Sequence, residues 1–226
     1  MTAAAVLTTA LAQRRERPGV DLAGSAPDLV AAAAAMARRF RAGGVLHAFG
    51  HDDADAHHIA VEFVHPVIVG KRALPAIAHR ADRAAFRLSH AAPGDLALAV
   101  CDAPARRDGE PPRGAVSAAL CSFGETALKR SAEGADSPKL QDEKRPDEKR
   151  PGEAGPVAAA LAAAGERGLL TVALAGRFWA GPPVDHLLTL PADDPLVLRE
   201  LQVSAYHLLW ELTHALLEHG PDGPTP

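Results

Sequence analysis

The apolar residues of the chain fall into short runs that alternate with segments of helical periodicity. Runs of about five to seven mostly apolar residues predict buried strands at 45–49, 74–78, 94–100, 169–175 and 185–190. Apolar residues that recur at helical spacing predict helices at 28–41, 54–64, 157–167 and 196–218. Strands joined mostly by helices form parallel sheets with helices on both faces. The pattern therefore predicts an α/β fold around a five-stranded parallel sheet.

The start of the chain is expected to form helices that precede the main domain. A short amphipathic helix is predicted at 2–17, and Ser25 with Pro27 marks the start of a second helix. Residues 1–42 are therefore expected to be N-terminal helices, and 43–219 the main domain.

A charged segment interrupts the main domain at about 103–155. It is rich in Pro, Gly, Lys, Glu and Asp, and residues 142–151 read Asp-Glu-Lys-Arg-Pro twice. Such a segment has too little apolar surface to offset the entropy that ordering costs. We expect 131–154 to be flexible, with a short helix at 115–129. The repeat is either a solvated insertion or a tract that docks on a protein partner.

The last predicted helix carries two stripes of side chains at helical spacing. The apolar stripe consists of Leu198, Leu201, Ala205, Leu208, Leu212 and Leu216. The polar stripe consists of Glu200, Ser204, His207, Glu211 and His214. Tyr206 and Trp210 belong either to a subunit contact or to the core.

Composition limits the classes of function. The 226 residues are 47% hydrophobic, which suits one domain with a sizeable core. A net charge of -4 gives no bulk attraction for nucleic acid. The longest apolar stretch, 29–37, is far shorter than the ~20 residues that a membrane helix needs. Cys101 and Cys121 form neither a disulfide framework nor a zinc spacing, so we expect a cytoplasmic protein.

Two polar side chains lie one helical turn apart after the first predicted strand. His58 and Glu62 are four residues apart, which places both on one face of a helix. The turn before them, 51–53, follows a strand end, where parallel sheets collect ligands. A His and a carboxylate at this spacing either share a metal ion or transfer protons. A surface pair without any function has the same spacing.

Four stretches of the sequence together carry a family resemblance. The first stretch begins with Gly43–Gly50 and ends with Arg72–Ala78. The others are Gly94–Leu96, 163–176 and 185–218. In this order they resemble the sugar isomerase (SIS) domain, and within it the phosphoheptose (sedoheptulose 7-phosphate) isomerase branch. The resemblance covers most of 1–102 and 156–219. It implies a flavodoxin-like three-layer α-β-α sandwich, assembled as a homodimer or homotetramer with sites between subunits.

The resemblance also implies roles for individual residues. In these isomerases a helix Glu and a His on the last helix move protons during aldose–ketose exchange, and Glu62 and His207 match them. Some members hold zinc with a His, a Glu, a Gln and the last-helix His, of which His58, Glu62 and His207 match three. The Gln position holds Arg199, which cannot ligate zinc. The neighbouring substitutes are Gln202 and Glu200.

Both phosphate loops depart from the family. The first reads Gly-Asn-Gly-Gly-Ser in the family but Gly50-His51-Asp52-Asp53-Ala54 here. The second reads Ser-Thr-Ser-Gly in the family but Cys101-Asp102-Ala103-Pro104 here. Phosphate is held by backbone N–H groups, hydroxyls and helix N-termini. The aspartates repel a dianion and the proline removes a donor, so the resemblance implies an acid/base pair beside an eroded phosphate cradle.

Three hypotheses of function therefore stay open. The first is a phosphosugar isomerase that has diverged and is weakly active or inactive. The second is a non-catalytic accessory or assembly factor. Related SIS proteins bind a replication initiator, and similar proteins are encoded near hydrogenase-maturation factors. The third is a metal- or small-ligand-binding domain that uses His51, Asp52, His58, Glu62 and His207.

Overall fold

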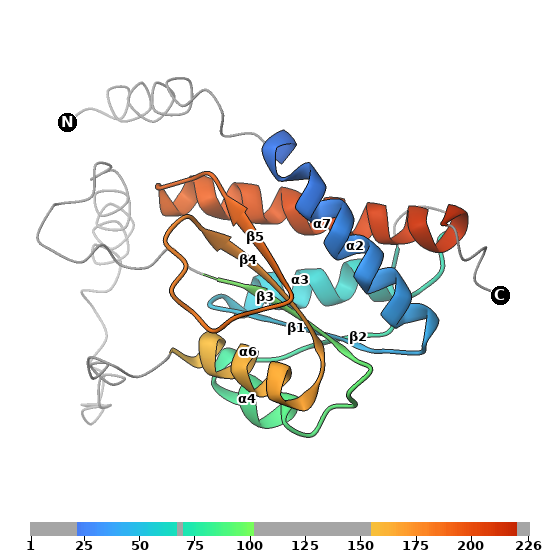
Figure 1. Ribbon diagram of the computed structural model, residues 1–226, viewed down its shortest axis with the longest axis horizontal. Helices are drawn as coiled ribbons and strands as arrows, with labels where there is room; N and C mark the ends of the chain where they lie inside the picture. Colours follow the sequence, from blue (N-terminus) through green and yellow to red (C-terminus); the bar gives the residue numbers. More distant parts are fainter. Residues whose placement is uncertain (1–21, 67–69, 102–154, 221–226) are drawn as a thin grey trace, which may run out of the picture. The chain divides into compact units, whose positions relative to one another are not determined.

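A parallel sheet of five strands forms the centre of the part of the chain that the structure describes. The structure, a computed structural model, describes residues 22–66, 70–101 and 155–220. The strands are β1 (Leu46–Gly50), β2 (Ala76–Ala78), β3 (Leu96–Val100), β4 (Leu170–Gly176) and β5 (His186–Leu190). They pair in the order β2-β1-β3-β4-β5, and every pairing is parallel (Figure 1). The predicted sheet is confirmed, with each strand close to its expected position.

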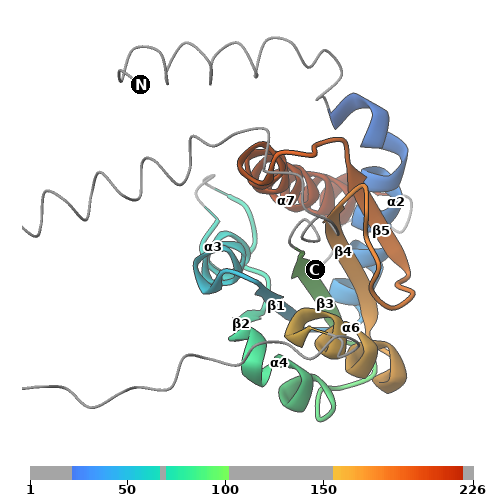
Figure 2. The same cartoon turned by 90° about the vertical axis from the view of Figure 1, so that its left-hand side faces the viewer.

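Helices cover both faces of the sheet (Figures 1 and 2). One face carries α2 (Ala26–Arg41), α3 (Asp53–Val64) and α7 (Pro195–His219), and a short 3-10 turn, η1 (Leu22–Ser25), precedes α2. The other face carries α4 (Ala81–Leu88) and α6 (Pro156–Arg167). The fold is therefore a three-layer α-β-α sandwich, and its strand order is that of flavodoxin-like sheets.

The central strands are buried because they pack against helices on both sides. Every residue of β1, β3 and β4 is buried, as expected of strands in a doubly covered parallel sheet. Leu46 and Ala48 of β1 pack in the core beneath α2, α3 and α7. Phe49 packs in the core beneath α4 and α6. This alternation brings every second side chain to the same helical layer.

The sequence pattern does not predict helix α4. The helix has eight residues, and only Ala84 and Leu88 of these are buried. Two buried positions give a weak periodic signal, and so short a helix is unstable in isolation. Its packing against α6 supplies the stability that its own sequence does not.

The buried face of α7 differs from the predicted apolar stripe. His214, expected on the polar stripe, is buried, while several of the predicted leucines are only partly buried. Tyr206 and Trp210 are also buried within this single chain, which favours the core interpretation of these two residues. The buried face of α7 is Leu198, Gln202, Ala205, Tyr206, Leu209, Trp210, Thr213, His214 and Leu217.

Some predictions fall outside the described residues. They concern the helices at 2–17 and 115–129 and nearly all of the charged segment at 103–155. They remain predictions. None of the helices that the structure describes combines the length and the apolar character needed to cross a bilayer.

Candidate functional site

The strand order creates a topological switch point between β1 and β3. The chain runs from β1 to β2 at one edge, and from β3 through β4 to β5 at the other. Ligands of such sheets bind beyond the carboxyl ends of the strands at the switch point. Gly50 ends β1 there, and a Cβ atom on it would lie 2.9 Å from the Val100 carbonyl oxygen. Glycine is needed at this position because β1 and β3 approach closely.

The turn after β1 places a carboxylate at the N-terminus of α3. Asp52 caps this helix, and its Oδ1 accepts a hydrogen bond from the Ala54 N–H at 2.8 Å. This bond, together with a hydrogen bond from Arg199, lowers the pKa of Asp52 below its ordinary value. Helix N-termini are common binding sites for anions. Here one of the N–H groups that could hold a phosphate binds the protein's own carboxylate.

Arg199 ties this turn to the last helix. Its Nη2 lies 2.7 Å from Asp52 Oδ2 and 3.1 Å from Asp55 Oδ1. The Asp55 side chain is only 10% exposed, so it depends on this cation more than the half-exposed Asp52 does. The hydrogen bond to Asp52 is the main cause that raises the pKa of Arg199. Arg199 thus neutralises carboxylates at the switch point, a role that the sequence did not indicate.

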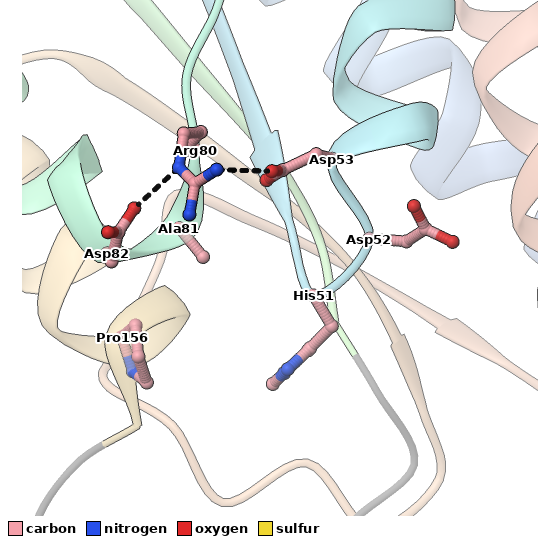
Figure 3. A pocket seen from close by; sticks show the side chains of 7 residues that line it. All are labelled: His51, Asp52, Asp53, Arg80, Ala81, Asp82 and Pro156. Carbon is pink, nitrogen blue, oxygen red and sulfur yellow. Dashed lines mark hydrogen bonds and ion pairs between the residues drawn. The ribbon is translucent and has the colours of Figure 1, made fainter. Parts of the chain in front are cut away.

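An open cavity of about 590 Å³ lies on the other side of the same turn (Figure 3). Its charged lining consists of three carboxylates and one guanidinium. Arg80 lies 3.2 Å from Asp82 and 3.7 Å from Asp53, measured from Nε and Nη1 to the nearest carboxylate oxygens. The lining residues are His51, Asp52, Asp53, Arg80, Ala81, Asp82 and Pro156. Its excess of negative charge suits a phosphate dianion poorly.

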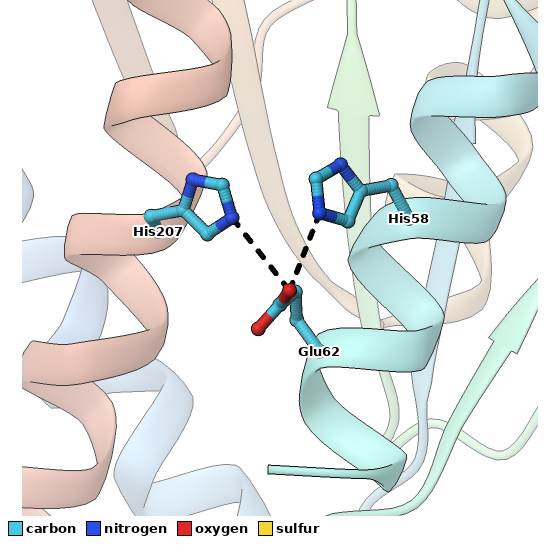
Figure 4. A group of neighbouring side chains, drawn as sticks. All are labelled: His58, Glu62 and His207. Carbon is cyan, nitrogen blue, oxygen red and sulfur yellow. Dashed lines mark hydrogen bonds and ion pairs between the residues drawn. The ribbon is translucent and has the colours of Figure 1, made fainter. Parts of the chain in front are cut away.

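Three further side chains meet between α3 and α7 (Figure 4). His58 and Glu62 come from α3, and His207 comes from α7. His58 Nε2 lies 3.2 Å from Glu62 Oε1, and His207 Nε2 lies 3.8 Å from the same oxygen. Glu62 is mostly buried, whereas both imidazoles are about two-fifths exposed. The three residues, called the His–Glu–His group below, therefore offer a carboxylate and two imidazoles to a ligand from solvent.

The His–Glu–His group fits the ligand chemistry of zinc. One ligating atom from each residue lies within 4.8 Å of the other two. Tetrahedral zinc with bonds of about 2.0–2.1 Å holds its ligand atoms roughly 3.4 Å apart, close to the separations from Glu62. Two imidazoles and one carboxylate form the donor set of several catalytic zinc sites, which keep a fourth position open.

The proposed substitutes for the missing zinc ligand do not belong to this group. Gln202 is buried, and its amide nitrogen donates to the main-chain oxygens of Cys101 at 2.7 Å and Leu174 at 3.0 Å. Gln202 thus joins α7 to the ends of β3 and β4. Glu200 is exposed and is not part of the cluster of ligating atoms. Cys101 is buried at the end of β3, and Asp102 lies outside the described residues.

Tyr206 is the residue near this group that the sequence did not single out for chemistry. Its hydroxyl lies 2.8 Å from His58 Nδ1, on the opposite side of the ring from Glu62. Burial, with smaller contributions from Asp55 and Glu62, raises the pKa of Tyr206 to about 12. Its contact with His58 joins residues 148 positions apart, so spacing along the chain gives no signal for it.

Known structures share this architecture at low sequence identity. A phosphoheptose isomerase from Francisella tularensis has a TM-score of 0.56 and 14% identity, over 93% of each chain. A phosphoheptose isomerase from Neisseria gonorrhoeae has a TM-score of 0.51 and 15% identity, over 93% of this chain and 94% of that one. No protein-family model and no curated protein matches the sequence. The chain therefore has the fold of the phosphoheptose isomerases, and at these identities the comparison shows the fold alone.

Proposed function

We propose that this protein binds a carbohydrate derivative without a phosphate group and catalyses its aldose–ketose isomerisation weakly. The observation that carries the proposal is the His–Glu–His group between α3 and α7 of a sugar-isomerase-like fold. It offers a mostly buried carboxylate beside partly exposed imidazoles from two helices. A carboxylate and an imidazole so placed are suited to general base and general acid catalysis.

In this proposal Glu62 and His207 divide the proton transfers. Glu62 removes the proton from the carbon beside the aldose carbonyl, and His207 protonates the carbonyl oxygen. The product of these two transfers is a neutral enediol. Transfer of the hydroxyl proton at the second carbon to His207, with return of the proton from Glu62 to the first carbon, gives the ketose and restores both residues. Every proton that leaves the sugar is matched by one that returns.

We infer that the substrate carries no phosphate group because carboxylates surround the start of α3. The N-terminus of α3 is capped by Asp52, whose other oxygen pairs with Arg199. Asp53 and Asp82 line the cavity on the far side of the turn. A phosphate dianion in this region would have to displace a carboxylate from its partners and approach the others. Neutral hydroxyl groups meet no such repulsion.

Proton exchange in heavy water tests the proposal without a coupled assay. Unphosphorylated aldoses and their phosphate esters are incubated with the protein, and loss of the C2 proton is followed by NMR. We expect slow exchange with unphosphorylated aldoses and no measurable exchange with the esters. Glu62→Gln should lower the rate by at least about 100-fold. His57→Gln is the matched control, because His57 is an exposed neighbour whose ring is hydrogen-bonded to the Asp53 carbonyl oxygen in its own helix.

Two results would contradict the proposal. One is faster exchange with the phosphate esters than with the parent sugars. The other is exchange that Glu62→Gln leaves unchanged, because the proton would then be removed by another group.

The ligand-atom separations favour a second candidate function, the binding of a zinc-like cation by His58, Glu62 and His207. When bound, such an ion would polarise a substrate carbonyl as a Lewis acid. Cobalt(II) titration, followed by its visible absorption, tests this directly. We expect about one ion per chain and loss of binding in His207→Gln. No saturable cobalt binding in the wild-type protein would reject this function.

A further inference from the structure

We propose that Tyr206 is a positioning residue, which holds the His58 ring so that its Nε2–H points at Glu62. Nothing in the resemblance assigns a role to this tyrosine. Its importance for catalysis rests on the proposed function, but the contact itself can be tested in the absence of sugar and metal.

The direction of the hydrogen bonds follows from the chemistry of the partners. An ionised carboxylate can only accept, so the 3.2 Å contact of Glu62 Oε1 with His58 Nε2 needs the proton on Nε2. In a neutral imidazole the other nitrogen, Nδ1, is then an acceptor. With His58 neutral, the Tyr206 hydroxyl, 2.8 Å from Nδ1, is therefore the donor. The chain of bonds runs from Tyr206 through His58 to Glu62.

Tyr206 is well placed to act as this donor. Its side chain is almost fully buried, and its ring packs edge-on against His58 with 5.4 Å between the ring centroids. Burial also favours the protonated phenol, which keeps the hydroxyl a donor throughout the neutral range. An exposed imidazole on a helix surface samples several rotamers. A fixed donor on the neighbouring helix selects one of them.

In this arrangement His58 and His207 have different roles. Glu62 Oε1 receives its hydrogen bond from His58, whereas His207 Nε2, at 3.8 Å, is too far for one. His58 thus orients the carboxylate, and His207 keeps its Nε2 for a ligand. A phenol both donates and accepts, so Tyr206 also suits the other tautomer of His58, whose free Nε2 could ligate a cation. Partners of this kind set the tautomer of metal-binding histidines.

Nitrogen NMR of metal-free protein at fixed pH tests the inference. The ¹⁵N ring signals of His58 are assigned by their loss in His58→Leu. We expect a protonated Nε2 and an unprotonated Nδ1 whose shift is that of a hydrogen-bonded acceptor. In Tyr206→Phe the Nδ1 signal should move to the position of an unbonded nitrogen. Trp210→Phe, a buried change one turn further along α7, should leave it in place.

Tyr206 is the only tyrosine among the 226 residues, which gives a reciprocal measurement. With ¹³C-labelled tyrosine, the single Cζ signal should shift in His58→Leu. This ¹³C measurement needs no variant of Tyr206, so it tests the contact between Tyr206 and His58 even when Tyr206→Phe does not fold.

Specific results would overturn the inference. They are an Nδ1 signal unchanged in folded Tyr206→Phe, a wild-type His58 with its proton on Nδ1, or a Cζ signal indifferent to His58→Leu. Failure of the sugar-exchange experiment with these signals intact would reject the proposed function and leave the role of Tyr206 standing.

Discussion

The first turn of α3 and the second half of the same helix hold polar side chains in different ways. In the first turn, Asp52 and Asp55 share Arg199, and Asp52 also caps the helix. In the second half, Glu62 contacts His58 and His207, whose rings are still partly exposed. The first region satisfies its charges internally, whereas the second still presents donors and acceptors to solvent.

This difference bears on which chemical groups of a ligand the two regions can accept. Proton transfer needs a carboxylate and an imidazole with open access. Anion binding needs unoccupied N–H groups at a helix N-terminus. This protein offers the first, whereas Asp52 occupies one of the N–H groups that the second needs. Sugar chemistry without phosphate recognition is the consequence that we propose.

Removing Arg199 should abolish the internal neutralisation of charge at the first turn of α3, and it should have the largest effect on stability. Arg199→Ala leaves Asp55 mostly buried without its cation, and we expect a loss of about 2–3 kcal/mol in the free energy of unfolding. Urea denaturation measures it. Asp55→Asn in the same background should recover much of the loss. The control is Arg80→Ala, whose ion pairs are exposed and whose loss should leave the denaturation midpoint nearly unchanged.

A comparable or smaller loss is expected when a methyl group is added at Gly50, the end of the strand that leads into α3. Gly50→Ala places a Cβ 2.9 Å from the Val100 carbonyl oxygen, and relieving the clash should cost about 1–3 kcal/mol. Gly94→Ala is the matched control, because a Cβ there meets no atom within 4 Å. Equal denaturation midpoints for the two variants would show that β1 and β3 do not approach as described.

A polar cluster outside the site offers a third case to compare with the two regions of α3. Its side chains bond to one another and to main-chain N–H groups. Asp95 accepts hydrogen bonds from the Val45 and Ala92 N–H groups, its Oδ2 lies 3.3 Å from His47 Nε2, and His47 Nδ1 lies 2.8 Å from His79 Nε2. All of these contacts are within the protein.

The pH dependence of stability should report this cluster. Burial, followed by the His47 ring and Arg87, lowers the pKa of His79 from 6.5 to about 4. Between these values the unfolded chain binds more protons than the folded chain, so the free energy of unfolding falls as the pH falls from 6.5 to 4. Since His79 is only half-buried, we expect a loss of about 1–2 kcal/mol.

Denaturation at several pH values measures the effect of His79. His79→Asn should flatten the curve in this range, and the exposed His90→Asn should not. A wild-type stability that rises on acidification from pH 6.5 to 4 would contradict the assignment.

The sequence predicted the framework of this protein better than its site. The strands and long helices follow from local periodicity, which packing between the layers reinforces, whereas α4 has too few buried positions to be recognised. The i,i+4 spacing of His58 and Glu62 is a local signal, and it correctly placed them on one helical face. The roles of Arg199 and Tyr206 depend on where α7 lies against α3, and no spacing along the chain encodes that contact.

Titration with inorganic phosphate tests the central claim most directly, in the wild-type protein and in Asp52→Ser. Serine keeps the helix cap but removes the negative charge of the carboxylate, which removes the repulsion at the start of α3 and leaves Arg199 paired with Asp55 alone. We expect no saturable binding to the wild-type protein at millimolar phosphate by calorimetry, and affinity at least about tenfold higher in Asp52→Ser. Saturable binding of phosphate to the wild-type protein, with the anion against the amides of residues 51–54, would contradict the account.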